Sequence, residues 1–120
     1  MATLTPTLTL TSADTTSDAL SLTVTDSLTT AVPNVDSTRI SVDTSGTTLI
    51  SNSVATINYV YIKNADSSAI LILETVAGTQ VFSDLQPGEF CFFPLKGSIG
   101  LKVKSSSGSA TVEYGYWTKG

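Results

Sequence analysis

The chain has 120 residues, a length that fits one domain built around a single core. Charged residues are few, 6 basic and 10 acidic for a net charge of −4, and serine and threonine make up almost a third of the chain. An acidic chain without a basic stripe has no electrostatic attraction for nucleic-acid phosphates, so we expect no nucleic-acid partner. The many β-branched threonines and the scarcity of strong helix formers predict an all-β fold.

The first segments alternate threonine or serine with aliphatic residues, over residues 3 to 11 and 18 to 26. This period of two is typical of strands with one apolar face. Pro6 lies in the first segment and has no N–H to donate to a neighbouring strand. We therefore expect residues 1 to 17 to form an extended N-terminal arm or edge strand, and residues 18 to 120 to form a β-sandwich domain.

Eight further strands are expected after this region. Their segments are residues 38–43, 47–51, 57–64, 69–76, 79–85, 89–95, 100–104 and 110–117. Short strands separated by turn-forming residues predict a two-sheet antiparallel sandwich, and the count of eight favours a jelly roll.

Two of the expected strands are apolar on both faces, at residues 70 to 73 and 90 to 93. One face can fill the core of the sandwich, and the other needs a second cover. In so short a chain, we expect that cover to be another copy of the protein, so the sequence predicts a homo-oligomer.

Catalysis is not expected, because the chain contains no histidine to activate a nucleophile. In a strand, Cys91 and Phe93 point to one side and Phe90 and Phe92 to the other, which makes the only cysteine a small buried hydrophobe. We predict no catalytic, cofactor-binding or metal-binding residues, since the aspartates follow no calcium-loop pattern and nothing in the sequence pairs the glutamates.

Aromatic residues lie only in the second half of the chain. Tyr59 and Tyr61 share one strand face, Tyr114 and Tyr116 share another, and Trp117 points to the opposite side from Tyr116. Exposed tyrosine and tryptophan can stack against sugar rings, but we favour their use in the core and in a subunit interface over glycan binding.

Residues 59 to 120 resemble small virion proteins of tailed bacteriophages. The resemblance lies in a YVYIKN strand, the LQPGEFCFFP turn and strand, a GLKVK strand and the terminal VEYGYW, preceded by the Thr/Ser-rich leader TLTLTSADTTSDALSLTVTDSLT. It implies a jelly-roll capsid cement, or decoration, protein that is made in the host cytoplasm and sits on the virion surface. Such a protein acts as a homotrimer that clamps major capsid protein subunits, without a cofactor or a membrane.

One alternative is a component of the phage tail or fibre, an adhesin that binds glycan, and a second is a cellular carbohydrate-binding module. The residues expected at an oligomer or partner interface are Leu4, Leu8, Leu10, Tyr59, Tyr61, Phe92, Phe93, Tyr114, Tyr116 and Trp117.

Overall fold

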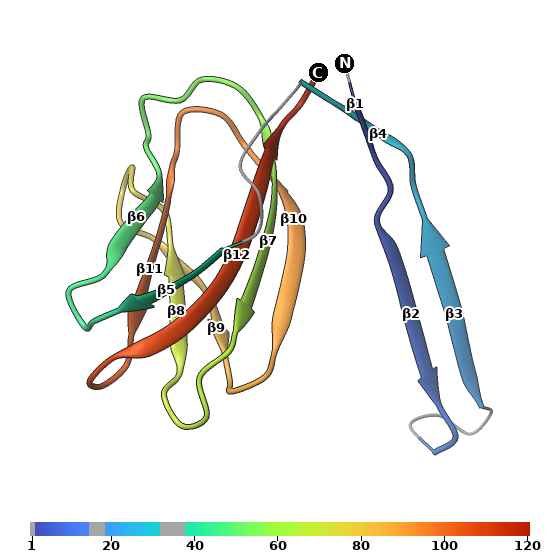
Figure 1. Ribbon diagram of the computed structural model, residues 1–120, viewed down its shortest axis with the longest axis horizontal. Helices are drawn as coiled ribbons and strands as arrows, with labels where there is room; N and C mark the ends of the chain where they lie inside the picture. The colour runs from blue at the N-terminus through green and yellow to red at the C-terminus, as the bar shows by residue number, and fades with distance from the viewer. Residues whose placement is uncertain (1, 15–18, 32–37) are drawn as a thin grey trace. The chain divides into compact units, whose positions relative to one another are not determined.

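The computed structural model describes residues 2–14, 19–31 and 38–120 (Figure 1). Contacts between residues divide the chain into two units. The first is Met1–Pro33 with Gly120, and the second is Asn34–Lys119. None of the described residues belongs to a helix long and apolar enough to cross a membrane.

The first unit is an antiparallel ribbon of four short strands. β2 (Thr7–Ser12) pairs with β3 (Leu20–Thr25), and β1 (Ala2–Leu4) pairs with β4 (Leu28–Thr30). The single strand expected over residues 3 to 11 is divided at Pro6, whose carbonyl oxygen instead accepts a 3.2 Å hydrogen bond from the Asp26 N–H. The ribbon therefore continues across the break.

The expected arm of residues 1 to 17 contributes β1 and β2, one side of each pair. The strands β3 and β4, which we expected to belong to the sandwich domain, pair with the arm and with neither sheet of the sandwich. Contacts accordingly separate the units after Pro33, and the strand β4 lies in a segment for which we predicted no strand.

The second unit contains the eight strands expected from the sequence. They are β5 (Thr38–Val42), β6 (Thr47–Ile50), β7 (Asn58–Asn64), β8 (Leu71–Glu74), β9 (Val81–Leu85), β10 (Phe90–Leu95), β11 (Leu101–Ser105) and β12 (Ala110–Thr118).

These strands form two four-stranded antiparallel sheets, in the orders β10-β7-β12-β5 and β6-β11-β8-β9 (Figure 1). This order is that of an eight-stranded jelly roll, so the predicted fold class is confirmed.

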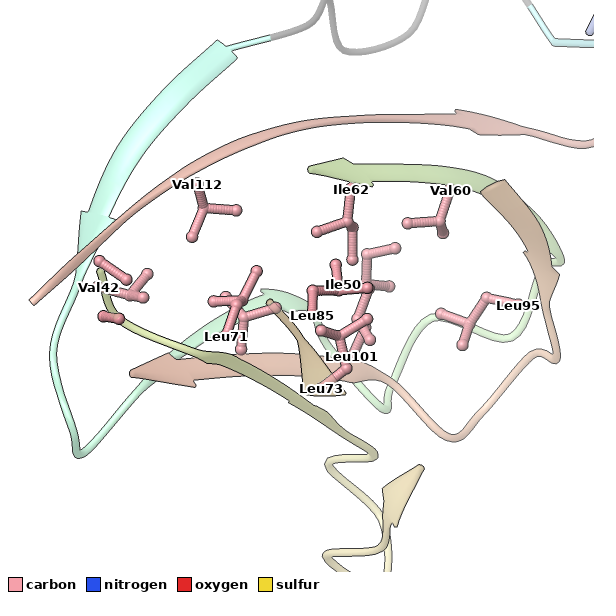
Figure 2. Close-up of a cluster of buried hydrophobic side chains, with 13 residues drawn as sticks. Val42, Ile50, Val60, Ile62, Leu71, Leu73, Leu85, Leu95, Leu101 and Val112 are labelled. Carbon is pink, nitrogen blue, oxygen red and sulfur yellow. The ribbon is translucent and has the colours of Figure 1, made fainter. Parts of the chain in front are cut away.

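The core lies between the two sheets and consists of aliphatic side chains from both (Figure 2). Ile62 and Val112 come from one sheet, and Leu71, Leu73 and Leu101 from the other, all of them fully buried. Since side chains alternate along a strand, the burial of Ile62 directs its neighbours Tyr61 and Lys63 to the opposite face. We call the face of sheet β10-β7-β12-β5 that points away from this core the outer face.

A buried asparagine connects the two sheets at one end of the sandwich. The side-chain nitrogen of Asn64, at the end of β7, donates to the carbonyl oxygens of Ala69 and Leu85, both at 2.8 Å. Its side-chain oxygen accepts the Asp66 N–H at 3.0 Å. Because Leu85 ends β9 in the opposite sheet, this one amide holds both sheets in register there.

Candidate functional site

Four of the expected interface residues lie together on the outer face. The strand register places Tyr59 beside Trp117 of β12, and Tyr61 beside Phe92 of β10. The rings of Tyr59 and Phe92 stack, with centroids 6.5 Å apart and planes at 20°. Tyr59 is only 8% exposed, so its ring offers little surface to a ligand.

Three other expected interface residues turn inward. Phe93, Tyr114 and Tyr116 are half-buried and pack against the core, and the two tyrosine rings stack with centroids 6.4 Å apart. The alternation that the sequence predicts for Trp117 and Tyr116 is present, and Trp117 shares the outer face with Tyr59. The expected aromatic set is thus divided between the two faces of one sheet.

A hydrogen-bonded group of polar residues borders the aromatic side chains of the outer face. The Tyr61 hydroxyl donates to Glu113 at 2.8 Å, and Arg39 pairs with the same carboxylate at 2.9 Å. The hydrogen bond from Tyr61, followed by that from Arg39, lowers the pKa of Glu113 below its usual value. Partial burial, together with Glu113, raises the pKa of Tyr61 to about 12. A neutral phenol and a charged carboxylate are both held in their ordinary forms, which suits binding more than proton transfer.

Cys91 lies on the core side of β10, opposite Ile62 of β7. Burial raises the pKa of its thiol above the usual value. A nucleophilic cysteine needs the opposite shift, which a nearby cation or base provides. The local environment of Cys91 is therefore that of a packing residue.

A buried charge cluster that was not predicted from the sequence lies on the second sheet. Glu74 is buried where its side chain points away from the core, and Lys102 and Lys104 of β11 approach its carboxylate oxygens at 3.7 and 3.3 Å. The register places Lys102 opposite Glu74 and Lys104 opposite Ile72. A signal was present in the sequence, since an alternating Lys-x-Lys strand is well suited to pair with a carboxylate across a sheet.

This cluster also bears on the strand that we expected to be apolar on both faces. Leu71 and Leu73 fill the core, whereas Ile72 is half-buried on a face that it shares with Lys104 and Glu74. Lysine stems can cover apolar surface while the charged head reaches water. The outward side of β8 therefore does not by itself require another copy of the protein. No group of three or more potential metal-ligating side chains occurs among the described residues.

The three expected interface leucines of the arm lie in the ribbon. Leu4 pairs with Leu28, Leu8 with Val24, and Leu10 with Leu22. Residues that pair across strands share a face, so one side of β2 and β3 is aliphatic, while the other carries threonine and serine. We call Leu8, Leu10, Leu22 and Val24 the ribbon face, and all four are 41 to 52% exposed.

Four more exposed apolar residues lie on β9 and β10, each of which is an edge strand of its sheet. Val81 and Phe82 of β9 are 56 and 46% exposed, and Phe90 and Phe92 of β10 are 62 and 39% exposed. The ring of Phe82 contacts Phe93 edge-on at 5.8 Å, which shows that the two strands are close. Val81 pairs with Glu74 on the outward side of one sheet, whereas Phe90 and Phe92 lie on the outer face of the other, so the four residues lie on both sides of this edge. We call them the β9–β10 patch.

Among the described residues, Ile57 is the only large exposed hydrophobic residue outside the ribbon face and the β9–β10 patch. Large apolar side chains that gather in this way mark interaction surfaces more often than scattered ones do. Comparisons with protein-family models, with curated proteins and with solved structures found no match.

Proposed function

We propose that this protein is a non-enzymatic structural component of a tailed-bacteriophage virion, a decoration protein that binds the outer capsid surface as a homo-oligomer. In this role it clamps neighbouring subunits of the major capsid protein and so stabilises the shell. The resemblance of residues 59 to 120 to small virion proteins gives the proposal its context, and it implies a homotrimer.

The observation that carries the proposal is the gathering of exposed apolar side chains into the ribbon face and the β9–β10 patch. A small jelly roll with two such surfaces is suited to assembly, because each surface loses unfavourable contact with water when a partner covers it. Two separate surfaces allow one chain to contact two partners at once, as a clamp requires.

The chemistry of the described residues also favours binding over catalysis. The thiol of Cys91 faces the core and has a raised pKa, and the carboxylate of Glu113 is held by Tyr61 and Arg39. Neither arrangement supplies the activated nucleophile or the matched acid and base that hydrolysis needs.

A tail or fibre adhesin that binds glycan is the second candidate. Tyr61, Phe92 and Trp117 share the outer face with the polar side chains of Glu113 and Arg39, which is a mixture that sugars can use. The burial of Tyr59 beneath this surface weighs against an open stacking platform.

The proposal is tested by adding the purified full-length protein to capsids that lack it and sedimenting the capsids. We expect the protein to pellet at a fixed, saturable ratio to capsid subunits and to raise the temperature at which the capsid disassembles. If the protein stays in the supernatant but binds immobilised glycans, and Trp117→Ala abolishes that binding, the adhesin is correct and the decoration role is wrong.

A further inference from the structure

We propose that the ribbon closes into a barrel with the ribbons of two further copies, in which β2 of each chain pairs with β3 of the next. The number of copies rests on the proposed function, which implies a homotrimer, whereas the pairing depends on the ribbon alone. The occupant of each free edge of the ribbon is therefore a strand of a second copy, residues 20–25 beside β2 and residues 7–12 beside β3.

Both strands of the ribbon have a free edge. Within the described part of the chain, β2 and β3 form a two-stranded sheet, so each has a hydrogen-bonded neighbour on one side only (Figure 1). The Asp26 N–H donates to the carbonyl oxygen of Pro6, its partner in the same register, which makes this pair and every second pair after it hydrogen-bonded pairs. The four residues of the ribbon face thus bond within the hairpin. The backbone N–H and C=O groups that point outward are those of Thr7, Thr9, Thr11, Ser21, Thr23 and Thr25.

These two edges lack the features that usually prevent an exposed edge from pairing. Such features are charged side chains, prolines and bulges. Neither β2 nor β3 contains a charged residue or a proline, and their pairing shows no bulge. The edge strands β9 and β10 of the jelly roll differ, since they contain Asp84 and Pro94. The edges of the ribbon are therefore suited to accept a further strand.

The strand that fits each edge is already present in the structure. β2 pairs with β3 over six residues, with Leu10 opposite Leu22 and Thr9 opposite Thr23. β3 of a second copy offers the same pattern of side chains to the other edge of β2. An offset by an even number of residues keeps the aliphatic side chains on one face, so the ribbon face continues from chain to chain.

The charges of the ribbon lie outside the paired strands. Residues 1–38 contain four aspartates and no lysine or arginine, and none of the four is in β2 or β3. Asp26 directly follows β3, and Asp14 lies two residues past the end of β2. No like charges are therefore opposed along the new pairs. At the rims of a barrel these carboxylates reach water, where salt screens their repulsion.

A closed barrel satisfies the free edges and the ribbon face together. The edge of β2 differs from the edge of β3, so the contact is heterologous, and its repetition around an axis gives a ring. Three copies supply strands that alternate in direction, as in an up-and-down barrel, which has no free edge. The ribbon faces turn inward and leave water, while threonine and serine face outward. Face-to-face stacking of two ribbons would cover the leucines but leave every edge unpaired.

The stability of the ribbon gives a further reason for closure. An isolated two-stranded hairpin is at best marginally stable in water, and three or more strands with an apolar face are needed for independent stability. Leu8, Leu10, Leu22 and Val24 are all more than 40% exposed in the single chain. Pairing with further copies supplies both the additional strands and the cover.

Hydrogen exchange of the full-length protein, followed by NMR, tests the pairing of the edges. We expect the amides of Thr9 and Thr23, which point outward from the hairpin, to exchange within about tenfold of the rates of Leu10 and Leu22. Free edges would leave the two threonine amides exchanging roughly a hundredfold faster than the leucine amides. That result would overturn the inference.

A pair of substitutions at one outward-pointing amide gives a second test. Thr9→Pro removes an N–H that the hairpin itself does not use, and proline is tolerated on a strand whose N–H faces solvent. Thr9→Val is the matched control, because it keeps the N–H and the β-branched shape. We expect Thr9→Pro to reduce the mass of the particle from three chains to one and Thr9→Val to leave it unchanged. A Thr9→Pro protein that still has the mass of three chains would contradict the barrel.

An equal mixture of isotope-labelled and unlabelled chains, refolded together, identifies the neighbour of each edge and does not depend on any variant. We expect nuclear Overhauser contacts between residues 7–12 of one kind of chain and residues 20–25 of the other. Contacts between residues 7–12 of both kinds would mean that β2 pairs with β2, and an absence of contacts between chains would mean that no second copy covers the ribbon. Either result refutes the inference.

The outcomes for the barrel and for the decoration role are separable. A barrel that forms in a protein unable to bind capsids would leave this inference standing and refute only the decoration role. A protein that binds capsids while its threonine amides exchange freely would refute the barrel alone.

Discussion

The hydroxyl group of Tyr61 donates a 2.8 Å hydrogen bond to the carboxylate of Glu113 on the adjacent strand of the outer face. The sequence places these residues 52 positions apart, and the antiparallel pairing of β7 with β12 brings them together. This contact joins the aromatic part of the outer face to its charged part and fixes the ionisation of both groups.

Tyr61→Phe removes the donor, and the pKa of Glu113 is then expected to rise toward its usual value. The folded state of the wild type holds the Tyr61 proton up to about pH 12, whereas an unfolded tyrosine loses it near pH 10. The folded state therefore binds more protons in this window, and its stability falls as the pH rises through it. Denaturant unfolding of both proteins should be measured between pH 10 and about 12. The free energy of unfolding should fall less steeply with pH for Tyr61→Phe than for the wild type, and identical slopes would contradict the raised pKa of Tyr61.

Asn64→Ala should be among the most damaging single substitutions of a polar residue. It leaves the Ala69 and Leu85 carbonyl oxygens and the Asp66 N–H without their partner at a fully buried position. Each unsatisfied buried group costs about 1 to 3 kcal/mol, so we expect a loss of ~3 kcal/mol or more in the free energy of unfolding. The exposed Asn52→Ala is the control, with a change within about 0.5 kcal/mol, and an equal effect of the two would refute the role of Asn64.

The cluster around Glu74 should depend on its lysines. Changing both Lys102 and Lys104 to Met keeps the stems but leaves a buried carboxylate without a cation. We expect the free energy of unfolding, measured by denaturant titration, to fall by about 2 to 3 kcal/mol. This is less than the cost of breaking a fully buried ion pair, because the lysine side chains are about one third exposed. Glu74→Gln, which removes the buried charge itself, should cost less. The reverse order would show that the lysines do not serve this carboxylate, and Lys119→Met is the exposed control.

Two glycines with similar backbone angles should respond differently to alanine. Gly100 has φ of +70°, and an added Cβ would lie 2.8 Å from the Ile50 carbonyl oxygen and 2.9 Å from the Val76 Cβ. Gly88 has φ of +86°, with nothing within 4 Å of such a Cβ. Gly88→Ala should thus cost only the backbone strain, about 1 to 2 kcal/mol, and Gly100→Ala roughly 3 kcal/mol or more. Equal losses of stability would show that the close approach at Gly100 is not limiting.

Much of the fold could be predicted because a period of two in side-chain polarity survives in nearly every strand. Where a strand is apolar on both faces, this alternation does not show which face packs against the core. Tyr114 and Tyr116 face inward and Trp117 outward, although all three suit either side equally. Pro6 predicted an irregular strand. The pairing continues past it because the Asp26 N–H, just after β3, donates to the Pro6 carbonyl oxygen, and the sequence did not indicate this contact.

The candidate surfaces could be predicted only in part, for a similar reason. Leu8 and Leu10 were readable as one face of a strand, whereas their partners Leu22 and Val24 follow from the hairpin register alone. The β9–β10 patch takes residues from two sheets, and no local pattern in the sequence identifies the contact between Phe82 and Phe93 that brings the two strands together. In the sequence, Glu74 lies near the end of a predicted strand. Only the register of β8 with β11, which places it opposite Lys102, shows that it belongs to a charge cluster.

The mass of the purified full-length protein in solution tests most directly the central claim, that the two exposed apolar surfaces serve assembly. Light scattering over a range of concentrations is predicted to give a single particle of a small integer multiple of the 12.5 kDa chain, three for the proposed trimer. A particle of 12.5 kDa at every concentration would contradict the claim.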